Sequence, residues 1–175
     1  MNFEPIIIKM GYTKERLLDM LSILVVCTGN TCRSPMAEAL LKQKAKETGL
    51  SDSVHITSAG LAAGGKFPAS QGAHSVMRRR GLDLSKHRSH QLAQQDVEMA
   101  DLILTMTRGH KQAILAFFPE VKDKVFTLPE FAGADNDVAD PYGGDVRVYD
   151  ACANQIVQLV DKIWEKIVAL AGNKA

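Results

Sequence analysis

Short apolar runs alternate with amphipathic segments along the chain. Four runs rich in β-branched residues are typical of strands buried in a parallel sheet: residues 22–26, 54–57, 102–104 and 125–128. Between and after them, apolar residues recur every three or four positions, as on one face of a helix. This alternation predicts parallel strands joined by helices through right-handed crossovers. The predicted fold class is α/β, a three-layer doubly wound fold with a four-stranded parallel sheet flanked by helices.

The first two predicted helices have recognisable start and stop signals. Ser34 is a candidate N-cap, and Pro35 suits the first helical position, so we expect a helix from there to Gly49. A second helix is expected over residues 70–80, because Gly81 follows it as a stop signal.

The third and fourth predicted helices are defined by their apolar faces. We expect Thr107 to cap the third helix and Pro119 to end it. The fourth should cover residues 146–171, with Asp145 as its N-cap. The residues expected to face inward are Ala113, Ile114, Phe117 and Phe118 in the third helix, and Val148, Cys152, Ile156, Leu159, Ile163 and Ile167 in the fourth.

The length of the chain favours a single core. With 175 residues, 46% of them hydrophobic, it can bury one full core, and we expect one folded domain over residues 21–172. Residues 1–20 are expected to form an N-terminal extension of uncertain role. The apolar run at residues 6–8 is too short for a signal peptide or a membrane span, so no targeting segment is expected.

Charge and cysteine usage narrow the choice of partner and compartment. Lysine and arginine total 21, and aspartate and glutamate total 20. Because no overall field favours nucleic acid or an anionic membrane, we expect neither as a partner. The three cysteines, Cys27, Cys32 and Cys152, form no regular disulfide framework, which predicts a reducing compartment, the cytoplasm.

Residues 27–34 form a loop that is suited to binding phosphate. Gly29 and Asn30 tolerate backbone angles that most residues avoid, so successive N–H groups can curl inward around an anion. The N-terminus of the following helix adds a positive end. Arg33 offers a planar fork that matches two oxygens of a phosphoryl group.

Cys27 stands at the mouth of this loop. The inward N–H groups, the helix dipole and Arg33 all favour a thiolate, which is a nucleophile toward a bound phosphorus atom. We therefore expect covalent catalysis through a phosphocysteine, with Ser34 donating a hydrogen bond to the departing sulfur.

Other interpretations of the loop explain less of it. Cys27 could be an inert buried cysteine, or with Cys32 half of a metal site, but neither accounts for Arg33. A metal site would need further ligands, and Cys152 lies in an amphipathic segment where packing is its expected role. A nucleotide-binding P-loop would end in glycine, lysine and serine or threonine. No metal and no cofactor is expected, since no step of the proposed chemistry uses one.

The segment VCTGNTCRSP, residues 26–35, resembles the signature of the low-molecular-weight protein tyrosine phosphatase family. The resemblance extends more loosely over residues 22–168 and includes the segments SAG at 58–60 and DPYG at 140–143. It implies a phosphatase domain at residues 21–172 that acts on phosphorylated proteins. It also implies a substrate-binding set of Thr28, Gly29, Asn30, Thr31, Cys32, Ser34 and Tyr142.

The predicted mechanism needs a carboxylic acid that donates a proton and later accepts one. Residues 129–145 form a long loop, and Pro141 keeps the residue before it extended. By chemistry alone Asp135, Asp137 and Asp145 compete with Asp140 for this role. The resemblance selects Asp140 as general acid and base and Tyr142 as a wall of the cleft. It also implies that Ser58 and His87, with Asn30 and Ser34, hold the loop in shape.

Thr31 indicates which phosphate is hydrolysed. Tyrosine-directed members of the family usually carry an aliphatic residue here, whereas threonine resembles the bacterial protein arginine phosphatases. Further segments resemble theirs: residues 27–40, 106–107, 110–112, 123–128 and 142–144. A threonine hydroxyl can orient a polar guanidinium or the hydrolytic water. The resemblance therefore implies a protein arginine phosphatase.

Two other activities remain open at this point. A tyrosine phosphatase of the same family is the alternative, because Tyr142 would suit an aromatic substrate. An arsenate reductase is less favoured, because such enzymes need further cysteines in mid-chain and none lies between Cys32 and Cys152. Cys32 also raises the hypothesis of redox regulation, since a nearby thiol can trap an oxidised Cys27 as a disulfide. The sequence does not define the oligomeric state.

Overall fold

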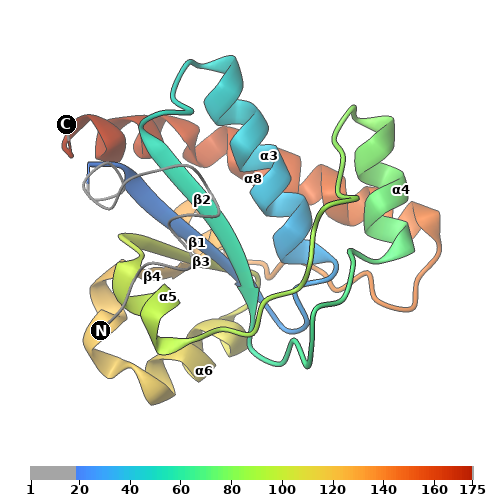
Figure 1. Ribbon diagram of the computed structural model, residues 1–175, viewed down its shortest axis with the longest axis horizontal. Helices are drawn as coiled ribbons and strands as arrows, with labels where there is room; N and C mark the ends of the chain where they lie inside the picture. Colours follow the sequence, from blue (N-terminus) through green and yellow to red (C-terminus); the bar gives the residue numbers. More distant parts are fainter. Residues whose placement is uncertain (1–18, 175) are drawn as a thin grey trace.

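The computed structural model describes residues 19–174 as a sheet covered by helices (Figure 1). Strands β1 (Leu21–Cys27), β2 (Val54–Gly60), β3 (Leu102–Thr105) and β4 (Val125–Thr127) form one sheet in the order β2-β1-β3-β4. All three neighbouring pairs are parallel. The predicted fold class is confirmed. The N-terminal extension, apart from its last two residues, lies outside the described residues, and the division at residue 20 stays a prediction.

Helices cover both faces of the sheet. The helices are α3 (Arg33–Glu47), α4 (Gln71–Arg79), α5 (Gln94–Met99), α6 (Arg108–Phe117), the single turn α7 (Leu128–Phe131) and α8 (Val146–Gly172). Figure 1 shows α3, α4 and α8 on one side of the sheet and α5 and α6 on the other. Within residues 19–174, no helix has the length and apolar character that a membrane span requires.

The central strand β1 explains how the layers are held together. Ile23, Val25 and Cys27 belong to the buried cluster that includes residues of α3 and α8, whereas Leu24 and Val26 belong to the cluster on the opposite face. Burying each valine, leucine or isoleucine side chain among them contributes about 1.5–3 kcal/mol to the stability of the fold. Because side chains alternate along a strand, Cys27 leaves the sheet on the side of α3.

Two of the three predicted N-caps are observed, one prediction is wrong, and Ser70 is a further cap that was not predicted. Ser70, Thr107 and Asp145 accept hydrogen bonds from backbone N–H groups in the first turns of α4, α6 and α8. Helix α3, however, begins at Arg33, and Cys32 occupies the N-cap position. Ser34 lies inside the first turn, because its hydroxyl contacts the preceding loop and not the helix backbone.

Two predicted inward-facing residues are exposed. Phe117 in α6 is 81% exposed and Val148 in α8 is 44% exposed. Helix α6 covers the short strands β3 and β4 near the sheet edge, so Ile114 is the apolar residue that it buries. The pattern also missed α5, α7 and a 3-10 segment over residues 119–124. Strand β4 ends at Thr127, because Thr127 and Glu130 form a capping box that opens α7.

Candidate active site

The loop between β1 and α3 curls around the sulfur of Cys27. Asn30 has φ 54° and is the one non-glycine residue among residues 19–174 with a left-handed backbone. This turn lets the Asn30 N–H donate to Cys27 Sγ at 3.3 Å. Ser34 Oγ lies 3.0 Å from the same sulfur. The Cys27 sulfur therefore has two hydrogen-bond partners from its own loop.

Asn30 is the anchor of the loop and is fully buried. Its Nδ2 donates to Ser34 Oγ at 2.9 Å and to Ser58 Oγ at 2.8 Å. The backbone carbonyl oxygen of Asn30 accepts from His87 Nε2 at 2.7 Å. The four residues implied to support the loop are therefore in one hydrogen-bond network. Oδ1 of Asn30 also accepts from the His90 N–H at 2.8 Å, a contact that sequence reasoning did not predict.

Ser58 connects this hydrogen-bond network to helix α3. The Ser58 hydroxyl donates to Oε2 of Glu38, a residue that sequence reasoning did not select. Glu38 is also paired with Lys42, one turn further along the helix. The Ser58 hydroxyl thus donates its hydrogen bond to the Glu38 carboxylate, and its oxygen accepts the hydrogen bond from Asn30 Nδ2.

Gly60 supports the loop from below, at the end of β2. A Cβ atom on this residue would lie 2.7 Å from the Thr28 carbonyl oxygen and 3.0 Å from the Asn30 nitrogen. Both are backbone atoms of the loop between β1 and α3. Glycine is required here because the loop backbone occupies the space of a side chain.

Arg33 and Asp140 meet across the cavity above Cys27. Arg33 is 4% exposed, and its Nη2 donates to Asp140 Oδ2 at 2.6 Å. Its Nη1 donates to the Val138 carbonyl oxygen at 3.3 Å. Asp140 keeps half of its side chain exposed, and its Oδ1 accepts from the Tyr142 N–H. The protein thus fixes the position of the Asp140 carboxyl group, while the exposed part of the side chain can reach a ligand.

One cavity of about 250 Å³ connects the predicted site residues. Its lining consists of Cys27, Thr28, Gly29, Thr31, Cys32, Arg33, Asp140 and Tyr142. Ser34 and Asn30 lie beneath it, and Ser58 and His87 contact Asn30 from outside the lining. The competing aspartates do not line this cavity: Asp145 caps α8, and Asp137 accepts from the Arg108 N–H.

Cys32 and Cys152 have different surroundings. Cys32 Sγ lies 3.3 Å from Ser70 Oγ and 3.4 Å from the hydroxyl of Tyr149. Burial and the contact with Cys32 raise the pKa of Tyr149. Burial raises the pKa of the Cys152 thiol to about 12, so this residue stays a packed thiol.

Among residues 19–174, no three His, Cys, Asp or Glu side chains gather as metal ligands would.

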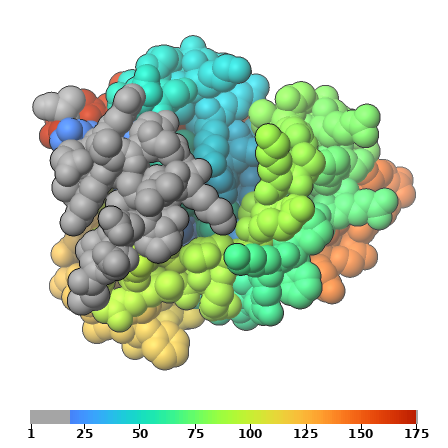
Figure 2. Space-filling view, viewed as in Figure 1, coloured from blue at the N-terminus to red at the C-terminus, as the bar shows by residue number. Residues whose placement is uncertain are grey.

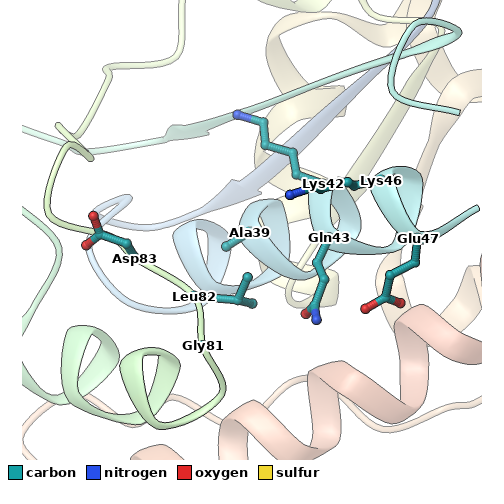
Figure 3. Close-up of a pocket in the computed structure, with 8 residues that line it drawn as sticks. All are labelled: Ala39, Lys42, Gln43, Lys46, Glu47, Gly81, Leu82 and Asp83. Carbon is teal, nitrogen blue, oxygen red and sulfur yellow. The ribbon is translucent and has the colours of Figure 1, made fainter. Parts of the chain in front are cut away.

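A larger cavity of about 590 Å³ lies elsewhere, between α3 and residues 81–83. It is visible as a hollow beside α3 in Figure 2. Figure 3 shows the charged side chains of Lys42, Glu47 and Asp83 pointing in different directions around it. Because it contains no nucleophile and no convergent set of charges, the smaller cavity is the candidate active site.

The fold and this cavity together define a class of enzyme. A nucleophilic cysteine, an arginine fork and a carboxyl group surround an anion-binding loop at the carboxyl end of a parallel strand, as in cysteine-dependent phosphatases. The family model described as "Low molecular weight phosphotyrosine protein phosphatase" matches residues 22–171. The chain belongs to this family. The prediction of an enzyme, a protein phosphatase and hence a hydrolase, is confirmed.

Individual relatives point to a narrower resemblance. A protein arginine phosphatase of Geobacillus stearothermophilus is 45% identical over 146 residues, covering 83% of this chain and 95% of its own length. The solved structure of a low-molecular-weight protein tyrosine phosphatase from T. tengcongensis has a TM-score of 0.80 at 44% identity, covering 83% of this chain and 99% of its own.

A third relative bears on the chemistry. It is an arginine phosphatase in which the active-site cysteine is replaced by a phosphorylated serine, with a TM-score of 0.79 at 39% identity, covering 83% of this chain and 95% of its own. The predicted resemblance to the bacterial protein arginine phosphatases is confirmed.

Proposed function

We propose that this protein hydrolyses phosphoarginine in other proteins through a phosphocysteine intermediate on Cys27. The observation that carries the proposal is the placement of Cys27, Arg33 and Asp140 around one cavity of about 250 Å³. The 45% identical protein arginine phosphatase supports the choice of substrate. The relative with a phosphorylated active-site serine supports attack by the residue at the loop mouth.

The first step transfers the phosphoryl group to sulfur. Cys27 Sγ attacks phosphorus as a thiolate, an S–P bond forms and the P–N bond to arginine breaks. The Arg33 guanidinium binds two phosphoryl oxygens, and protonated Asp140 gives its proton to the leaving nitrogen. Because a guanidine is a strong base, this proton transfer matters more than it would for a phenol.

The second step regenerates the enzyme. The Asp140 carboxylate accepts a proton from water while the water oxygen attacks phosphorus, and the S–P bond breaks. Ser34 Oγ, 3.0 Å from Cys27 Sγ, donates a hydrogen bond to the departing sulfur. Inorganic phosphate is the product. Asp140 is paired with Arg33 at 2.6 Å, so a bound phosphoryl group competes with Asp140 for the guanidinium.

Thr31 is the residue that we propose selects phosphoarginine. Its side chain lines the cavity. Its hydroxyl lies 3.6 Å from Cys32 Sγ, a long and weak contact, so it keeps the capacity to bind a polar substrate group. A site that pairs a substrate N–H rejects analogues without one, because the hydroxyl would otherwise be left unpaired.

The proposed partners are phosphorylated proteins, and the proposed compartment is the cytoplasm. Tyr142 is 81% exposed beside the cavity, where it can contact the chain that carries the phosphorylated residue. All three cysteines are free, as expected in a reducing compartment.

The covalent step is tested with Cys27→Ser and Asp140→Asn. We expect Cys27→Ser to abolish turnover while inorganic phosphate still binds, since Arg33 and the loop N–H groups remain. Asp140→Asn should slow phosphoarginine hydrolysis about 100-fold or more, in line with the loss of a general acid. A Cys27→Ser protein with undiminished activity would contradict the covalent mechanism.

The substrate is tested by comparing phosphoarginine and phosphotyrosine peptides. We expect the wild-type protein to prefer phosphoarginine and Thr31→Ile to shift the ratio toward phosphotyrosine. Cys152→Ser, a change to a packed residue outside the cavity, is the matched control and should leave the ratio unchanged. If the wild-type protein prefers phosphotyrosine, the second candidate function, a tyrosine phosphatase with Tyr142 against the aromatic ring, is correct.

A further inference from the structure

His110 is a buried histidine that the mechanism above does not use. It lies in the first turn of α6, is 8% exposed, and donates its backbone N–H to Thr107, the N-cap. Its Nε2 is 2.9 Å from the hydroxyl oxygen of Thr28. Thr28 directly follows Cys27, so this imidazole contacts the phosphate-binding loop from the sheet face opposite α3.

The second ring nitrogen allows the proton of the imidazole to be assigned. Nδ1 is buried and has no hydrogen-bond partner among residues 19–174. A neutral imidazole carries one proton, on Nε2 or on Nδ1. Buried unpaired N–H groups are rarer in proteins than unpaired acceptors, so we assign the proton to Nε2. His110 then donates to Thr28, and the Thr28 hydroxyl hydrogen is left for another acceptor.

Burial keeps the ring neutral, and the nearby charges act on it in both directions. Arg33 from α3 and Asp137 and Asp140 from the loop before α8 are the charged groups that act on it. Burial, and then Arg33, lower the pKa of His110 below its ordinary value, against the opposing effect of the two aspartates. At neutral pH the residue is therefore an uncharged donor, and it does not compete with Arg33 for an anion.

Thr28 faces the ligand side of the loop. Its side chain is exposed and lines the cavity with Cys27 and Arg33. The unprotonated oxygens of a phosphoryl group carry its negative charge and are strong acceptors. The free hydrogen of Thr28 is the complementary partner for such an oxygen, provided that the hydroxyl does not rotate to donate to a protein group instead.

We propose that His110 is a positioning residue of the phosphatase: its Nε2–H occupies the Thr28 oxygen, so that the Thr28 hydroxyl donates its hydrogen to the bound phosphoryl group. The inference rests on the proposed function only in taking a phosphoryl group as the ligand. It holds for phosphoarginine and phosphotyrosine alike, because both present the same oxygens.

Three substitutions at His110 separate hydrogen bonding from packing. In His110→Gln the amide nitrogen reaches the position of Nε2, whereas in His110→Asn it reaches only that of Nδ1. His110→Phe keeps the ring and removes both nitrogens. We expect His110→Phe and His110→Asn to weaken inorganic phosphate binding and kcat/KM about three- to ten-fold, the scale of one hydrogen bond. His110→Gln should recover most of this loss.

A double-mutant cycle with Thr28→Val tests the coupling. Thr28→Val should reduce kcat/KM about ten-fold, and adding His110→Phe should then have less than about a two-fold effect. Thermal unfolding is followed for every variant. Between pH 5 and 8, His110→Gln should remove the part of the pH profile that His110 protonation contributes.

The outcomes distinguish this inference from the proposed function. If His110→Phe costs the same in both backgrounds, or if His110→Gln is as impaired as His110→Asn, the positioning role is wrong. Phosphate binding is titrated directly, without turnover, so this result does not depend on which substrate the enzyme prefers. Failure of the proposed function would instead show as an active Cys27→Ser protein with the coupling intact.

Discussion

Gly60→Ala is expected to damage the active site although Gly60 itself does not line the cavity. The added Cβ would lie 2.7 Å from the Thr28 carbonyl oxygen, 3.0 Å from the Asn30 nitrogen and 3.0 Å from the Gly29 carbonyl carbon. All three atoms belong to the backbone of the phosphate-binding loop. None can move aside by a side-chain rotation, so the loop itself must shift.

The size of this shift follows from the contact distance. The shortest contact must lengthen from 2.7 Å to an ordinary 3.4 Å, so the loop at Thr28 moves by about 0.7 Å. A displacement of about 1 Å from productive geometry can cost about 100-fold in rate, and we therefore expect kcat/KM to fall between about 10- and 100-fold. Overpacking of this kind costs about 1–3 kcal/mol of stability, so the protein should remain folded.

The assay compares kcat/KM, inorganic phosphate binding and thermal unfolding for Gly60→Ala and Gly109→Ala. Gly109 is the matched control: the same Cβ would have its nearest neighbour at 3.7 Å, and the residue lies inside α6. We expect Gly109→Ala to keep its activity and to gain about 0.5–1 kcal/mol of stability from better helix propensity. Activity of Gly60→Ala within two-fold of wild type would refute the view that β2 sets the position of the loop.

Three further outcomes are expected. Asn30→Ala should reduce stability by about 3 kcal/mol in urea denaturation, because the buried Asn30 side chain loses three hydrogen bonds. If Cys32 traps oxidised Cys27 as a disulfide, thiols should restore the peroxide-treated wild-type protein but not Cys32→Ala; equal recovery of both would remove this hypothesis. Burial lowers the pKa of His55 and His110, so protonation favours the unfolded chain. Stability should decline as the pH falls below about 6.5, and His55→Gln should reduce the decline.

The sequence predicted the parts of the fold whose signals are local. Strand β1 is buried on both faces, and a continuous apolar run is the direct record of that environment. The caps of α6 and α8 were recognisable because each cap bonds to a backbone group two or three residues away. Phe117 could not be placed, because its exposure depends on how far the neighbouring strands extend beneath α6.

The active-site residues also differ in whether they could be predicted from the sequence. The loop at residues 27–34 could be identified because its chemistry is contiguous in the sequence. His110 and Tyr149 could not be identified, because they reach Thr28 and Cys32 from 82 and 117 residues away and stand in ordinary helical patterns. Ser34 was misassigned as a helix cap because a serine before a proline favours that role locally. In the folded loop its hydroxyl contacts Cys27 and Asn30, the other role that the sequence analysis gave to this residue.

These contacts separate residues that set the rate from residues that set the choice of substrate. The loop is held from three directions, by Gly60 and Ser58 of β2, by residues 87–90, and by His110 of α6. A loop that is already held in its binding conformation needs no reorganisation when the phosphoryl group binds. It stabilises that group whichever residue the group is attached to. Weakening these anchors should therefore reduce hydrolysis of phosphoarginine and phosphotyrosine by similar factors. Thr31 and Tyr142 also line the cavity, and we propose that they face the variable part of the substrate, so their substitution should change the ratio between the two.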